Sequence, residues 1–176
     1  MPQDRDQEFI CLQKSSELGD ANSMGQLGDR YFFGTDGCER DLTRGIKFYS
    51  AAASSGSVTA HYRMGNICFD GDGRSVDKGL AARYFEFAAE RGDAFAQNNL
   101  AYLYEKGEGV RQDLRLCCYW LKKSADQGFA DAQNGLGEML LEGRGVEVDL
   151  VVAREWFEKA AAQNCDAAIK NLEKFR

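Results

Sequence analysis

The side chains with the widest chemical range in this 176-residue sequence are its single histidine and its six cysteines. His61 has no serine or cysteine partner at a spacing that suggests a nucleophile and its base, so a surface histidine is favoured over a general base. The cysteines show no regular spacing and no C-x-x-C pair. We therefore expect reduced, structural thiols, and neither a disulfide framework nor a zinc site. The six cysteines are Cys11, Cys38, Cys68, Cys117, Cys118 and Cys165.

The acidic segment from Asp70 to Gly73 begins like a calcium-binding loop. It departs from that pattern at the next two positions, because Arg74 and Ser75 stand where the loop needs an oxygen ligand and its glycine. The sequence also contains no phosphate-binding glycine loop and no nucleophile elbow. We therefore expect no catalytic residues, no metal and no cofactor, and the sequence does not predict an enzyme.

The charge balance limits the class of partner. Lys and Arg number 22 against 28 for Asp and Glu, a formal charge of −6, which disfavours binding to nucleic acid. No apolar run reaches the roughly 18 residues of a membrane span, and the first ten residues are acidic and polar, unlike a signal peptide. The sequence as written therefore predicts a cytoplasmic protein without a membrane span, and it leaves open whether a leader was removed.

The chain repeats itself at a shift of 36 residues, which predicts a tandem-repeat architecture. The first unit has one extra residue between Gly34 and Gly37, so the columns before that turn are offset by one. Cys117 shares a column with Ala81 and Ala153, so we interpret it as a small packing residue. The repeating columns are Gly37, Gly73, Gly109 and Gly145; Asp41, Asp77, Asp113 and Asp149; Phe48, Tyr84, Trp120 and Trp156; and Leu27, Met64, Leu100, Leu136 and Leu172.

Each unit is predicted to form two helices, because apolar residues recur at helical spacing on both sides of a glycine turn. In the third unit the first helix should span residues 94–106 and end at Gly107, where glycine allows the left-handed backbone that closes a helix. Asp113 should then cap the second helix. We predict one domain over residues 1–176: a capping helix in 1–18, repeats at 19–55, 56–91, 92–127 and 128–163, and a second capping helix in 164–176.

The third unit resembles the Sel1-like repeat (SLR) family, which is related to tetratricopeptide repeats. The resemblance rests on the stretch from Ala96 to Tyr104, on Gly107-Glu108-Gly109-Val110, and on Asp113, Trp120 and Lys123. It implies an all-α, right-handed solenoid superhelix of about four helix-turn-helix repeats closed by half-repeat caps. It also implies an interaction scaffold, without naming the ligand.

The first helices of the repeats are expected to line a concave face. If Leu100 and Tyr104 point to the core, helical geometry turns Asn98, Tyr102 and Glu105 away from it. Burial of these side chains between adjacent repeats is the alternative interpretation. Carried to the other repeats, the register gives the candidate protein-binding residues Phe32, Tyr62, Asn66, Phe69, Asn98, Tyr102, Glu105, Asn134 and Glu138.

The favoured function is a scaffold or adaptor that holds a peptide or protein domain on this face, with aromatic side chains as anchors. Acidic residues such as Glu105 and Glu138 suggest a partner with basic character, although a solvated acidic face would need no partner. The alternative is a cytoplasmic immunity or inhibitor protein that neutralises a toxin or effector. A repeat-borne enzyme is the least favoured hypothesis.

Overall fold

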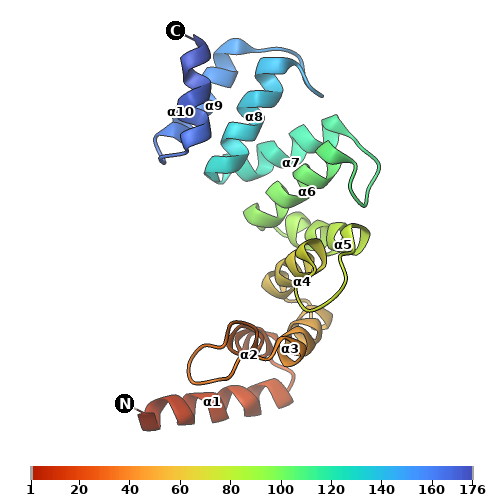
Figure 1. The fold of residues 1–176 in the computed structure, drawn as a ribbon, viewed down its shortest axis with the longest axis vertical. Coiled ribbons are helices and arrows are strands. Elements are labelled where there is room, and N and C mark those ends of the chain that lie inside the picture. Colours follow the sequence, from red (N-terminus) through yellow and green to blue (C-terminus); the bar gives the residue numbers. More distant parts are fainter. Residues whose placement is uncertain (1, 176) are drawn as a thin grey trace. The chain divides into compact units, whose positions relative to one another are not determined.

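The computed structural model describes residues 2–175, with side chains described for residues 7–175. Over that range the chain forms ten α-helices and a final 3-10 turn, and no strand, which confirms the predicted all-α class (Figure 1). It divides into two compact units, residues 1–87 and 88–176. The helices are α1 (Pro2–Glu17), α2 (Ala21–Phe33), α3 (Leu42–Ser54), α4 (Val58–Asp70), α5 (Lys78–Glu90), α6 (Ala94–Lys106), α7 (Leu114–Asp126), α8 (Ala130–Glu142), α9 (Leu150–Ala161) and α10 (Asp166–Leu172).

The repeated aspartates cap the second helix of each repeat, as predicted. Oδ1 of Asp113 accepts hydrogen bonds from the backbone N–H groups of Arg115 and Leu116 at 2.9 and 3.0 Å. Such bonds satisfy amides that have no partner within the helix. The same contact is made by Asp41 to Arg44, by Asp77 to Leu80 and by Asp149 to Val152.

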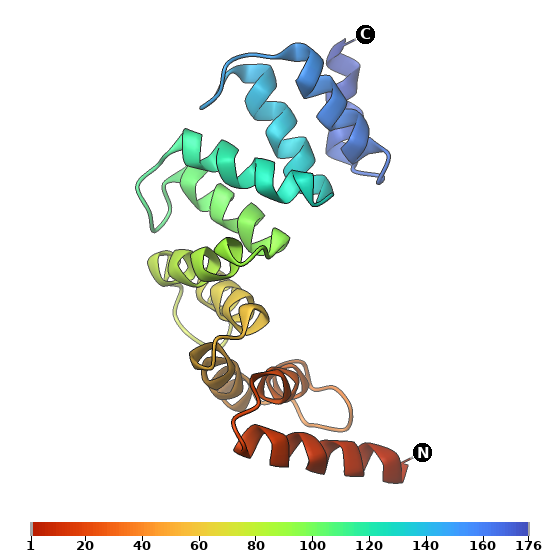
Figure 2. The ribbon, with the colours of Figure 1, turned by 180° about the vertical axis from the view of Figure 1, so that it is seen from behind.

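The turn between the two helices of a repeat opens with a glycine in the left-handed region. Gly107 has a φ of 71°, and its N–H donates to the carbonyl oxygen of Leu103, so α6 ends where the sequence predicts. Gly34, Gly71 and Gly143 end α2, α4 and α8 with the same conformation. The loops that follow project from the helices and are clearly visible in Figure 2.

The core of the first unit is built from large rings packed over glycines. Tyr49 of α3 is 1% exposed, and its ring lies where Gly28 of α2 has no side chain. Phe85 of α5 is fully buried and lies over Gly65 of α4 in the same way. The glycines therefore allow neighbouring helices to approach with an aromatic ring between them.

The second unit repeats this arrangement with Phe157 of α9 over Gly137 of α8. Its core includes Leu136, Met139, Trp156 and Phe157. Leu100 and Tyr104 of α6 were expected to point to the core. Leu100 is 1% exposed, and Tyr104 is half-buried and packs against the core of the second unit, so the predicted helical register is confirmed.

All six cysteines are free thiols in the structure. Burial is the main reason why the pKa of the Cys117 thiol rises to about 12, and the neighbouring Cys118 adds to it. Because the thiolate is the reactive form, Cys117 should resist alkylation in the native protein, whereas exposed Cys11 should react. We expect six titratable thiols after anaerobic denaturation without reductant, measured with a chromogenic disulfide. A count of four or fewer would contradict the absence of disulfides.

Candidate protein-binding surfaces

In the first unit, three of the predicted binding residues share one side of α4. Tyr62, Asn66 and Phe69 are all half-buried. The rings of Tyr62 and Phe69 lie 6.2 and 6.3 Å from the ring of the core residue Phe85. We call these three residues the α4 face. Its aromatic rings are held against the core and partly open to solvent, which is how an anchor for a partner is normally presented.

Phe32 was expected on the same surface, and this prediction is wrong. The side chain is 7% exposed and packs against Tyr49, with ring centroids 5.7 Å apart. The cause is Gly45 on α3, where an added Cβ would lie 2.9 Å from the Phe32 backbone. Because Gly45 has no side chain, α2 and α3 approach closely and enclose Phe32. The neighbouring Phe33 is 50% exposed instead, and the Arg63 guanidinium lies 5.4 Å from its ring.

In the second unit, α6 presents Tyr102 to solvent at 40% exposure, and the Lys106 ammonium lies 5.7 Å from its ring. Asn98 and Glu105 are half-buried on the same helix. We call Asn98, Tyr102 and Glu105 the α6 face. An exposed tyrosine beside half-buried polar groups gives this face both apolar area and hydrogen-bonding capacity.

Asn134 was also expected on a solvent-facing surface, and this prediction is wrong as well. It is 9% exposed because Asn171 of α10 covers it, and Nδ2 of Asn171 donates to Oδ1 of Asn134 at 3.0 Å. Oε1 of Glu138 accepts from both amides, at 2.9 Å from Asn171 and 3.2 Å from Asn134. These three side chains form a polar network that joins α8 to α10.

Glu105 and Glu138 of the predicted binding residues, and Asp29 in the column of Asn66 and Tyr102, all have partners within the chain. Oε1 of Glu105 accepts a hydrogen bond from Nη1 of Arg144 at 2.8 Å. Burial alone would raise the pKa of Glu105, but the bond from Arg144 and the charge of Lys106 outweigh it and hold the pKa below its usual value. Asp29 accepts from the Tyr49 hydroxyl at 2.6 Å and pairs with Arg63 at 3.2 Å. These contacts remove the need for a basic partner to neutralise the three carboxylates.

The side chains considered for catalysis or metal binding do not form a site among the described residues. His61 is half-buried, its ring stacks on Phe87 at 3.5 Å, and its Nδ1 lies 2.8 Å from the Ser57 carbonyl oxygen. Among the residues whose side chains are described, no group of three or more His, Cys, Asp or Glu could hold a metal. Within the same part of the chain, no helix is both long and apolar enough to cross a membrane.

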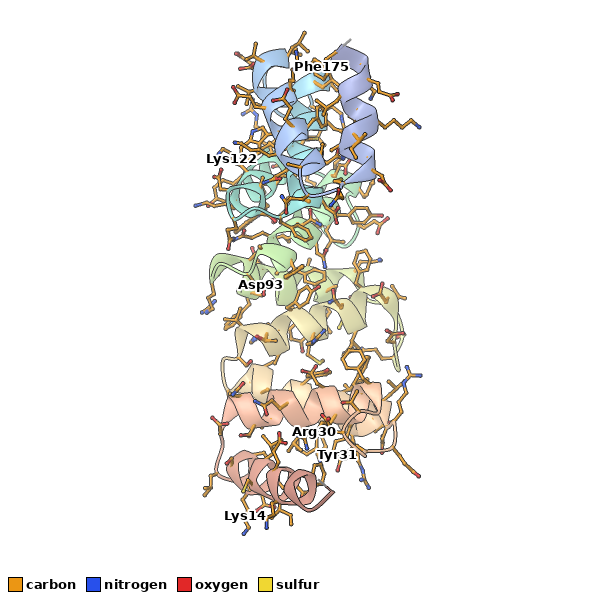
Figure 3. All side chains as sticks on the ribbon, turned by 90° about the vertical axis from the view of Figure 1, so that its left-hand side faces the viewer. Lys14, Arg30, Tyr31, Asp93, Lys122 and Phe175 are labelled. Carbon is orange, nitrogen blue, oxygen red and sulfur yellow. The ribbon has the colours of Figure 1, made fainter. Side chains whose placement is uncertain are left out.

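Arg30 is a buried charged residue that the sequence did not predict. It is 6% exposed in a position where the later repeats place Ile67, Leu103 and Met139, and Nη2 pairs with Oε1 of Glu8 on α1 at 2.6 Å. The guanidinium also lies 5.9 Å from the Phe9 ring, on the side of α2 that faces α1 (Figure 3). An arginine in a column that is apolar in the other repeats could have indicated that α2 packs against a different kind of helix, here α1.

These helix pairs define the chain as a tandem helical-repeat protein of the solenoid class. The model of the Sel1 repeat matches residues 21–57, 58–93, 94–129 and 130–165, so the chain belongs to the Sel1 repeat family. Proteins of this family are in general interaction scaffolds and not enzymes.

Two solved structures are similar over nearly the whole chain. A protective antigen of uropathogenic Escherichia coli with an SLR fold is 34% identical, with a TM-score of 0.89 over 93% of this chain. A Sel1 repeat protein from Oxalobacter formigenes is 32% identical, with a TM-score of 0.86 over 96%. The present chain spans 35% and 48% of those two chains.

Two further similarities are weaker. The Arabidopsis thaliana ERAD-associated E3 ubiquitin-protein ligase component HRD3A is 30% identical over 70 residues, which is 40% of this chain and 10% of that protein. An immunity protein of Pseudomonas aeruginosa shares the fold at 22% identity and a TM-score of 0.55, covering 91% of this chain and 59% of that one.

Proposed function

We propose that this chain is an interaction module that binds a peptide or protein segment on the solvent-facing sides of its first helices. The observation that carries the proposal is the α6 face, where Tyr102 is 40% exposed while Leu100 and Leu103 of the same helix are at most 1% exposed. The α4 face offers two further aromatic side chains, Tyr62 and Phe69, in the columns of Asn98 and Glu105. Tyrosine is enriched among the residues that dominate binding energy in protein interfaces.

The similarity to HRD3A supports an adaptor role, because that protein is a component of a larger assembly. An immunity or inhibitor protein is the second candidate, favoured by the formal charge of −6. Asp29 pairs with Arg63 and Glu105 pairs with Arg144 within the chain, which argues against recruitment of a basic partner by these carboxylates. We therefore expect the ligand to be held mainly through a hydrophobic or aromatic side chain.

We expect Tyr62→Ala and Tyr102→Ala each to weaken binding of a captured partner by about 1–3 kcal/mol, because truncating an aromatic anchor removes packed area. Calorimetric titration of the partner against the wild type and each variant measures the loss. Stability should change little for Tyr102→Ala, since that side chain is the more exposed of the two.

The matched control is Arg83→Ala, an exposed position on α5 that should leave binding within about 0.5 kcal/mol. Lys47, the equivalent residue in the first repeat, is unsuitable as a control because it lines a pocket. If both tyrosine variants bind like the wild type while Arg83→Ala does not, the partner uses the second helices and the proposed face is wrong.

A further inference from the structure

The first unit contains a pocket of about 360 Å³ between α1, α2 and α3. Its walls are Met24 and Tyr31 of α2 together with Phe48 and Ala51 of α3. Tyr31 lies on the side of α2 toward α1 (Figure 3). The volume falls at the lower end of the range for ligand sites, which suits one large side chain.

One wall of the pocket is a flat aromatic surface. The rings of Tyr31 and Phe48 are stacked with centroids 5.7 Å apart and an interplanar angle of 1°. The edge of Phe9 on α1 supports Tyr31, with centroids 6.3 Å apart. Because the rings are held on two sides, the wall is already formed before a ligand arrives, which lowers the entropic cost of binding.

The pocket is open because of the residues that the first repeat carries there. In the next repeat Phe87 stands in the column of Ala51, and His61 in the column of Met24. The rings of His61 and Phe87 stack at 3.5 Å and occupy the equivalent space between α4 and α5. Alanine at position 51 leaves that space empty in the first repeat.

Among the described side chains, those with a charge that line this pocket are two cations, Arg44 and Lys47. Arg44 lies 5.5 Å from the Tyr31 ring and 3.3 Å from a carboxylate oxygen of Asp41. Lys47 is exposed and takes part in none of the ion pairs found among the described side chains. By contrast, a groove at the equivalent place in the second unit is lined by Lys123 but also by Glu90 and Asp126.

We propose that this pocket binds a segment of a protein partner in which one aromatic or large aliphatic side chain is flanked by carboxylates. The apolar side chain enters beside Met24 and Ala51 and packs on the Tyr31–Phe48 wall, and a flanking carboxylate pairs with Lys47. The charge selects the partner: a positive, apolar pocket in a chain of net charge −6 favours an acidic segment over a basic one. This site shares no residue with the α4 face or the α6 face.

A titration of the isotope-labelled protein with the peptide acetyl-Glu-Glu-Phe-Glu-Glu-amide, followed by amide NMR, tests the proposal. We expect saturable shifts centred on Met24, Phe48 and Ala51, with a Kd below about 1 mM. The affinity should fall severalfold between low and high salt, because the charged contact is at the surface. The charge-inverted peptide, with lysine in place of each glutamate, should bind at least about fivefold more weakly.

Two variants and a matched control locate the site. Ala51→Phe introduces the residue that the next repeat carries and should abolish binding by filling the pocket, while far-UV circular dichroism verifies the helical fold. Lys47→Glu should weaken binding at least about fivefold, and Arg83→Glu, the same charge change in the next repeat, should leave it unchanged.

The proposal is overturned if the acidic peptide shows no saturable shifts up to about 5 mM, or if folded Ala51→Phe binds it like the wild type. Equal losses in Lys47→Glu and Arg83→Glu would also overturn it, since they would reflect net charge alone. Tyr62→Ala and Tyr102→Ala should not affect this peptide, so the outcome is independent of the proposed function.

Discussion

Replacement of Gly145 by alanine is expected to destabilise the protein by about 3 kcal/mol, combining backbone strain with steric overlap. Gly145 has a φ of 72°, which L residues with a side chain rarely adopt. In addition, a Cβ at this position would overlap the backbone carbonyl of Leu114 at the start of α7. A carbonyl in the backbone of a helix cannot move aside as a flexible side chain can, so the turn after α8 would have to shift.

The matched control is Gly128→Ala, whose φ is 91° but whose Cβ would meet no atom within 4 Å. It carries the conformational strain without the overlap, and we expect a loss of only about 1 kcal/mol. Urea denaturation of both variants gives the two free energies of unfolding. Equal losses would show that the approach of the turn to α7 contributes nothing, and that only backbone conformation requires glycine at position 145.

The sequence predicts this fold well because its information is local and repeated. The position of Asp113 relative to Gly107 identifies where one helix ends and the next begins, and the structure places both residues in the expected conformations. Agreement of the same columns in the other repeats makes each assignment independent of any single residue. Helix propensity, capping and glycine turns all favour the same result in this chain.

The solvent exposure of the candidate binding residues was predicted less well, because exposure depends on neighbouring helices and the periodicity of one helix carries no information about them. Phe32 and Phe69 share a column, yet Phe32 is enclosed because Gly45 lets α3 approach α2. Asn134 is enclosed because α10 lies over α8 and supplies Asn171. The column of Gly45 holds Ala81, Cys117 and Ala153 in the other repeats, so the sequence shows that the first repeat has the smallest residue there. It does not show how closely α3 approaches α2 at that glycine.

The pocket beside Ala51 was not predicted for a similar reason. A change from a large to a small residue within one column can be absorbed by repacking or can leave a space, and only the positions of the neighbouring helices decide between the two. In this chain the stacked rings of Tyr31 and Phe48 keep the space open.

Gly28→Ala and Gly25→Ala, two substitutions in the interior of α2, are expected to change stability in opposite directions. Alanine is the better helix former by roughly 1 kcal/mol, which by itself would stabilise both variants. At Gly25 no atom lies within 4 Å of an added Cβ, so Gly25→Ala should stabilise by about 0.5–1 kcal/mol. At Gly28 an added Cβ would lie 2.5 Å from Cδ1 of Tyr49, so Gly28→Ala should destabilise by about 2 kcal/mol.

The Gly28 effect is large because Tyr49 has no room to move. Its ring is 1% exposed, and its hydroxyl donates to Asp29 at 2.6 Å, so a displaced ring would lose both core packing and a partly buried hydrogen bond. Thermal and urea unfolding of the two variants beside the wild type measures the signs directly. If Gly28→Ala proved as stabilising as Gly25→Ala, helix propensity would outweigh ring packing, and the close approach of α2 to α3 would be looser than the structure shows. Because the two residues lie about one turn apart in the same helix, a difference in sign can arise only from what an added Cβ would meet at each position.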